Sequence, residues 1–157
     1  MKKYSIGFLV GLILCCAPIA NAYQFEDYEW DASIEDVKDS IRSKYKHLIR
    51  VGESLIEYED QQYNAECKVL LIFTPKPQKL MLIRISWLYE SIGHNLKRKL
   101  INVYGEPAEK REESFGGTYV WTIERDQETL RLTYTPQSTE LIYKGGRYVD
   151  EVGNELK

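Results

Sequence analysis

Apolar residues recur at helical spacing in two separate segments of the chain. In the first, Ser33 lies three residues before Asp36, a spacing typical of a helix N-terminus, and the stripe that follows consists of Ile34, Val37 and Ile41. The second stripe ends at Gly105 and Pro107, which are strong helix terminators, and it consists of Ile92, Leu96, Leu100 and Val103. The pattern predicts one helix over residues 33–45 and another that begins near Tyr89 or Ser91 and ends at Tyr104.

The remaining segments alternate with a period of two residues, which is typical of strands. The clearest covers residues 65–73, where every second residue is apolar, from Ala65 through Cys67 to Phe73. Further strands are expected at residues 47–51, 54–59 and 80–87 before the second helix, and at 119–124, 129–134 and 140–144 after it. These elements predict an α+β domain with two helices packed on one face of an antiparallel sheet of about seven strands.

The last three predicted strands carry many aromatic residues. Alternation favours one inward face composed of Tyr119, Trp121, Ile123, Leu130, Leu132, Tyr134, Leu141 and Tyr143. An exposed aromatic patch on the same strands is the alternative.

The order of helix, strands, helix, strands raises the alternative of two α-β-β-β repeats. Aligning the helices matches three pairs of residues that are each 59 positions apart: Val37 with Leu96, Ile41 with Leu100, and Tyr45 with Tyr104. Any two amphipathic helices can be aligned in this way. Duplication therefore remains one of two interpretations.

The first 22 residues have the composition of a secretory signal peptide. Lys2 and Lys3 precede an apolar run, and small residues at Ala20 and Ala22 form a peptidase site. The run is shorter than the about 20 residues that cross a bilayer. We therefore expect cleavage after Ala22, a single domain over residues 23–146 and a polar C-terminal tail over 147–157. The expected location is the periplasm or the external medium.

Cysteine positions bear on anchoring and on disulfides. Cys15 would permit lipid attachment, but Leu14 stands before it where lipidation sites carry a small residue, so we favour soluble export over a lipoprotein. Removal of the leader also removes Cys16 and leaves Cys67 as the one cysteine, so no internal disulfide is expected.

Charge narrows the classes of partner. The chain has 21 Lys and Arg residues and 24 Asp and Glu residues; the leader holds two of the basic residues and no acidic one, which leaves a net charge of −5. Such an acidic domain suits neither nucleic acid nor anionic lipid. The predicted partner is another envelope or secreted protein or a cell-wall component, with no stable membrane insertion after cleavage.

Three features of the sequence resemble known exported proteins. The run from Trp30 to Ser33 that leads to Val37, the sequence Tyr104-Gly105-Glu106-Pro107 and the later Trp121 together resemble exported bacterial proteins of unknown function. Residues 91–144 are also similar to small outer-membrane assembly lipoproteins and to the repeats of β-lactamase-inhibitory protein. The resemblance implies their fold and a role in binding proteins or assembling the envelope without chemistry.

Motifs for catalysis, cofactors and metals are absent from the sequence. His47 and His94 have no ligand-spaced neighbours, and the acidic run from Glu26 to Asp39 lacks the glycine of a calcium loop. We therefore predict no metal, no cofactor and no catalytic residue. The opposing hypothesis is a small exported hydrolase that uses carboxylates or Cys67, with His94 as the partner of the thiol; the apolar strand face around Cys67 favours a core position instead.

Aromatic residues near the new N-terminus are the predicted binding residues. They are Tyr23, Phe25, Tyr28 and Trp30, which mix with acidic residues just before the first helix. Tyrosine and tryptophan combine a large contact area with a polar tip, which suits protein interfaces. Trp30 is also placed to cover the apolar face of that helix.

Overall fold

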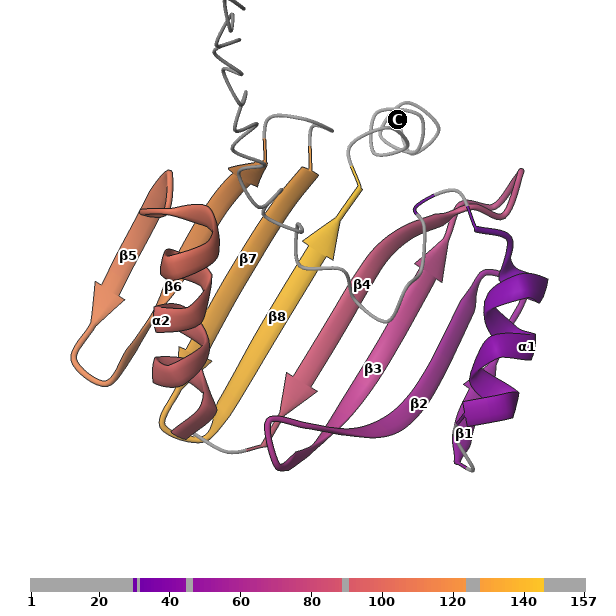
Figure 1. Ribbon diagram of the computed structural model, residues 1–157, viewed down its shortest axis with the longest axis horizontal. Helices are drawn as coiled ribbons and strands as arrows, with labels where there is room; N and C mark the ends of the chain where they lie inside the picture. The colour runs from indigo at the N-terminus through magenta and orange to yellow at the C-terminus, as the bar shows by residue number, and fades with distance from the viewer. Residues whose placement is uncertain (1–29, 31, 45–46, 89–90, 124–127, 146–157) are drawn as a thin grey trace, which may run out of the picture.

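One antiparallel sheet of eight strands forms the body of the molecule (Figure 1). The computed structural model describes residues 30, 32–44, 47–88, 91–123 and 128–145. Its helices are α1 (Ile34–Lys44) and α2 (Ser91–Tyr104), and its strands are β1 (Leu48–Val51), β2 (Leu55–Gln62), β3 (Ala65–Phe73), β4 (Leu80–Trp87), β5 (Glu109–Glu113), β6 (Gly116–Ile123), β7 (Glu128–Thr135) and β8 (Ser138–Lys144). The predicted α+β class is confirmed.

From each edge of the sheet to its centre, the strands follow one another in chain order. The order runs β1-β2-β3-β4-β8-β7-β6-β5, so β4 and β8 pair at the centre and each half consists of one helix followed by four consecutive strands. Both helices lie against one face of the sheet, α1 over the first half and α2 over the second (Figure 1). Each half has one strand more than the α-β-β-β unit suggested by the sequence.

β5 is the strand that the sequence analysis missed, which raises the count from about seven to eight. Its sequence, Glu-Lys-Arg-Glu-Glu, contains no apolar residue, and all five residues are exposed. The strand exists because its backbone pairs with β6 at the edge of the sheet. Charged side chains are common on such edges because they discourage pairing with other chains. Alternation cannot reveal a strand with neither face buried.

Hydrogen bonds confirm the predicted start of α1 and the predicted end of α2. At the start of α1 the amide of Asp36 donates to Oγ of Ser33 at 3.2 Å, which satisfies one of the free amides of the first turn. After α2, Gly105 has a φ of 79°, and its amide donates to the carbonyl of Ile101 at 2.8 Å. The Gly105 carbonyl in turn accepts from Nε1 of Trp121 at 2.9 Å, which ties the end of α2 to β6.

The hydrophobic core lies between the sheet and the two helices. Neighbouring strands place one row of residues in register across the sheet: Ile56, Leu71, Ile83, Tyr143, Leu130 and Trp121, all of them buried. The helices add Ile34, Val37 and Ile41 from α1 and Ile92, Leu96 and Leu100 from α2. The expected inward face of the last strands is thus confirmed. Val103 was wrongly assigned to the α2 stripe, since it is 45% exposed.

α2 approaches the sheet most closely at Gly93. A Cβ atom built there would lie 2.5 Å from Cβ of Tyr134 on β7, a separation that real Cβ atoms do not show. Gly93 is buried, so the missing side chain lets the helix backbone rest on the tyrosine.

We predict that Gly93→Ala destabilises the protein by about 1–3 kcal/mol, because the added methyl overpacks the contact with Tyr134. Helix propensity alone would give the opposite sign, since alanine stabilises a helix interior by up to about 1 kcal/mol over glycine. Urea denaturation measures the effect. Asn102→Ala, at an exposed position of the same helix, is the control and should change stability little. Stabilisation by Gly93→Ala would contradict the close contact.

Candidate functional site

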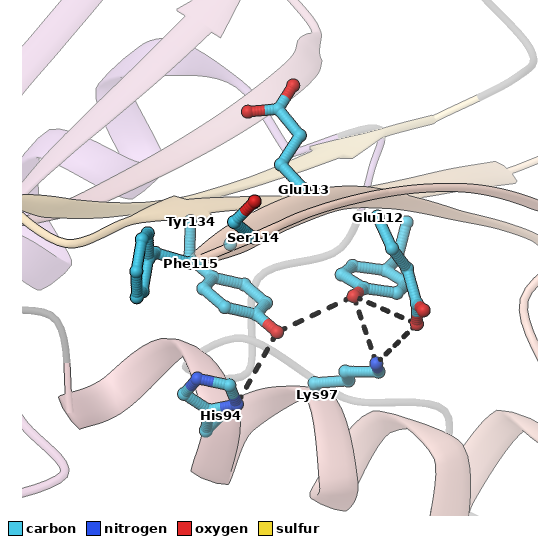
Figure 2. A pocket seen from close by; sticks show the side chains of 9 residues that line it. His94, Lys97, Glu112, Glu113, Ser114, Phe115 and Tyr134 are labelled. Atoms are coloured by element: carbon cyan, nitrogen blue, oxygen red, sulfur yellow. Dashed lines mark hydrogen bonds and ion pairs between the residues drawn. The ribbon is translucent and has the colours of Figure 1, made fainter.

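A hollow of about 280 Å³ lies between the first turns of α2 and the turn that joins β5 to β6 (Figure 2). Its lining is mainly polar and aromatic, and consists of His94, Lys97, Glu112, Glu113, Ser114, Phe115, Gly116, Tyr119 and Tyr134. Five of these residues, His94, Lys97, Glu112, Tyr119 and Tyr134, are linked by direct contacts and are called the tyrosine cluster below.

The elements of the second half of the sheet converge on this cluster. His94 and Lys97 lie three residues apart on α2, so they project from neighbouring turns of one side of the helix. Tyr119 and Tyr134 belong to the inward faces of β6 and β7, and Glu112 comes from β5. Their contacts therefore join one helix to three strands.

Two glycines leave room for the tyrosines at the turn between β5 and β6. A Cβ atom on Gly116 would lie 2.1 Å from the carbonyl oxygen of Tyr134. One on Gly117 would lie 2.9 Å from the hydroxyl of Tyr119. A side chain at Gly116 would thus collide with the backbone of Tyr134, and one at Gly117 would collide with the Tyr119 side chain, so both positions favour glycine.

Lys97 is held by three contacts at one side of the hollow. Its Nζ donates to Oε1 of Glu112 at 3.1 Å and to the hydroxyl of Tyr119 at 2.9 Å. The same ammonium lies 4.1 Å from the centre of the Tyr119 ring, within the range of a cation–π interaction. The positive charge is therefore paired within the cluster.

The two tyrosines connect this ion pair to His94. Their rings are stacked, with centroids 5.8 Å apart and planes at 10°. Their hydroxyl oxygens are 3.5 Å apart, and the hydroxyl of Tyr134 lies 3.4 Å from Nδ1 of His94. Both of these contacts are long for hydrogen bonds, so the Tyr134 hydroxyl is the weakest link of the cluster.

The contacts shift the pKa values of three side chains. Burial, followed by the hydrogen bond with Tyr119, raises the pKa of the Tyr134 phenol from 10.0 to about 12. Burial works against the charge of Lys97, but the hydrogen bonds to Tyr119 and Glu112 outweigh it and raise the pKa of the ammonium. The hydrogen bond from Lys97 lowers the pKa of the Glu112 carboxyl.

All three shifts move a pKa away from neutrality. A general acid or base works best when its pKa lies near the working pH, and a lysine nucleophile needs a lowered pKa. At neutral pH, Glu112 stays ionised, Lys97 stays protonated and Tyr134 stays neutral. These three side chains are therefore suited to acting as fixed donors and acceptors rather than to exchanging protons near neutral pH.

Of the four residues predicted to bind a partner, the structure describes only Trp30, which does not line the hollow. Trp30 is half-buried and packs on Tyr143, with ring centroids 4.9 Å apart, and a Cβ on Gly145 would lie 2.7 Å from its ring. It also packs against the hydrophobic core, as its second expected role requires. Tyr23, Phe25, Tyr28 and the cleavage site at Ala22 fall outside the described residues, as do the leader and the polar tail.

Cys67 lies on β3 in the first half of the sheet, whereas His94 lies on α2, over the second half. Cys67 is 4% exposed in the core on β3, whereas the ring of His94 lies 4.8 Å from that of Tyr134 on β7. Two strands, β4 and β8, separate β3 from β7. Among the described residues, no group of three or more His, Cys, Asp or Glu side chains could hold a metal ion.

In the part of the chain that the structure describes, no helix is long and apolar enough to cross a membrane.

No protein-family model, curated protein or solved structure matches the chain. The resemblance to exported bacterial proteins and to inhibitor repeats therefore stays a prediction.

The sequence pointed to three residues of the cluster, Tyr119, Tyr134 and His94, but to neither Lys97 nor Glu112. Tyr119 and Tyr134 were correctly assigned to the inward face of the sheet. Their hydroxyls, however, lie next to polar side chains of α2 and β5. Glu112 could not be included because β5 itself was not predicted. The sequence signal that could have indicated the close packing is the set of glycines at positions 93, 116 and 117, which lie opposite the two inward-facing tyrosines.

We predict that Tyr134 ionises near pH 12 in the folded protein, against 10.0 for an unperturbed phenol. Because folding raises this pKa, the resulting stabilisation is complete below pH 10.0 and is lost as the pH rises through about 12. The free energy of unfolding should thus fall more over this window in the wild type than in Tyr134→Phe.

Ultraviolet absorbance of tyrosinate follows the ionisation, and urea denaturation at each pH follows the stability. Tyr104→Phe, at the far end of α2, is the control and should keep the high-pH ionisation. If Tyr134→Phe removed a phenol that titrates near pH 10 instead, the burial of the cluster would be contradicted.

Proposed function

We propose that the protein is an exported binding module, periplasmic or secreted, that performs no chemistry of its own. The observation that carries this proposal is the tyrosine cluster, in which the charges of Lys97 and Glu112 are paired at 3.1 Å beside a solvent-facing hollow. Phe115 stands at the rim with 72% of its surface exposed, so an apolar ring is available to a partner next to polar groups. Exposed aromatic rings beside fixed polar groups are common at binding sites.

The alternative of a small exported hydrolase has less support. A cysteine nucleophile has to reach its substrate as a thiolate, and Cys67 lies in the apolar core. The Glu112 carboxylate accepts bonds from both Lys97 and Tyr119, and its lowered pKa makes it a weak base. Binding without catalysis is therefore the better interpretation.

The proposed partner is another envelope or secreted protein or a cell-wall component. The net charge of −5 expected after removal of the leader speaks against nucleic acid and anionic lipid. Tyr23, Phe25 and Tyr28 remain candidates for a second contact surface. Trp30 is the weakest of the four candidates because it packs on Tyr143.

We also propose that the two halves descend from one unit of a helix and four strands. The symmetric strand order supports this, as do the equivalent helix positions Val37 and Leu96, and Ile41 and Leu100, which are all buried.

Affinity capture of the tagged protein from envelope extracts tests the binding function. We expect a reproducible partner that is lost with Phe115→Ala and retained with Arg98→Ala, an exposed change on α2 outside the hollow. Absence of any reproducible partner would contradict the proposal. Rapid alkylation of Cys67 in the folded protein at neutral pH would favour the hydrolase instead, because a core thiol should react only after unfolding.

A further inference from the structure

The hollow between α2 and the β5–β6 turn has a volume that suits a small ligand group. Its volume of about 280 Å³ lies just under the about 300–1,000 Å³ of typical small-molecule sites. His94, Glu112 and Phe115 are all exposed, so the hollow opens to solvent. A ligand that fills it would be one ring or one side chain rather than an extended molecule.

The charges in the hollow are balanced. Lys97 is paired with Glu112, so an anionic ligand would have to compete with that carboxylate and a cationic ligand would have to compete with that ammonium. Glu113 does not change this balance, because its side chain points away from the hollow (Figure 2) and its carboxylate lies 3.7 Å from Nε of Arg111. The hollow therefore favours a ligand without net charge.

Unused hydrogen-bonding atoms remain around this neutral site. Within the described residues, His94 bonds through Nδ1 and leaves Nε2 without a partner, while Glu112 uses Oε1 for its contacts and leaves Oε2 without one. The contacts of the Tyr134 hydroxyl are long, at 3.4 and 3.5 Å, so an added hydroxyl could compete for them. These atoms include both donors and acceptors, and an alcohol hydroxyl can serve as either.

An apolar platform completes the arrangement. The exposed ring of Phe115 stands beside Tyr134 at the rim, on the side where His94 rises from α2 (Figure 2). The negative face of an aromatic ring attracts weakly positive C–H groups, such as those on the face of a saturated ring. One apolar wall next to several hydroxyl-binding atoms matches the two kinds of surface that a pyranose ring carries.

We propose that this hollow binds a neutral saccharide ring, with Phe115 packing on its C–H face and the His94, Tyr134 and Glu112 side chains bonding its hydroxyls. The proposal rests on the binding function above and specifies its ligand. A protein side chain as the occupant is the alternative that the following test separates.

The test is an NMR titration of the whole protein with one neutral, one cationic and one anionic sugar: N-acetylglucosamine, glucosamine and glucuronate. We expect saturable shifts of the His94 and Tyr134 ring signals with the neutral sugar and weaker binding of the cationic and anionic ones. Phe115→Ala should lower the affinity for the neutral sugar by about two- to tenfold, which is the range expected for the loss of an aromatic contact. His94→Ala should have a similar effect, and Arg98→Ala should have none.

Three results would overturn the proposal: no saturable shift with the neutral sugar, shifts away from the hollow, or tighter binding of either charged sugar. A second titration with the disaccharide chitobiose separates this inference from the proposed function. If the disaccharide stays intact and produces saturable shifts, both the saccharide inference and the proposed binding function are supported. Release of N-acetylglucosamine from the disaccharide would contradict the proposal that the protein performs no chemistry. Capture of a protein partner in the absence of sugar binding would overturn only the proposal of a saccharide ligand.

Discussion

The packing of α2 on the second half of the sheet determines how the side chains of the tyrosine cluster meet. Gly93 brings the helix backbone against Tyr134, and on the next turn Lys97 reaches Glu112 on the edge strand. A helix held farther from the sheet would separate His94 from β7 and Lys97 from β6 and β5. Hydrophobic burial supplies the stability of this packing, through Leu96 and Leu100, while the polar contacts fix its register.

The two halves share an order of elements but present different surfaces. The first half ends at β1, an edge strand of four residues on which Ile49 and Val51 are exposed. The edge strand of the second half is β5, in which every residue is charged and which supplies Glu112 to the cluster. α2 carries basic residues and no acidic one, whereas α1 carries both signs, so the interaction between a basic helix and a charged edge belongs to the second half.

The sequence was sufficient to predict the elements and buried faces that follow from the spacing of apolar residues. Both helices, the inward face of the last strands and the stop at Gly105 follow from spacing and from residues with one dominant conformational preference. β5 could not be predicted, because a strand of charged residues at an edge is stabilised by pairing with β6 and by no burial of its own. Val103 was misassigned for a different reason: its neighbours Ile101 and Tyr104 pack against the core at the end of α2, whereas Val103 itself is exposed despite its helical spacing.

The candidate site was harder to predict than the fold. Its side chains come from one helix and three strands, so their proximity depends on register and on helix position rather than on any local pattern. His94 was considered as a partner for Cys67, but the structure brings it to Tyr134. Glycines that would each clash with a tyrosine if they carried a Cβ were the one local signal of the close approach.

A double-mutant cycle on Tyr119→Phe and Tyr134→Phe tests most directly whether the cluster acts as one hydrogen-bonded unit. The two hydroxyls lie 3.5 Å apart on stacked rings that are 1% and 3% exposed, so removal of one changes the environment of the other. The account predicts that the two changes in unfolding free energy fail to add, by about 0.5 kcal/mol or more. Additivity within about 0.3 kcal/mol would show that the two tyrosines are independent core residues and would contradict the account.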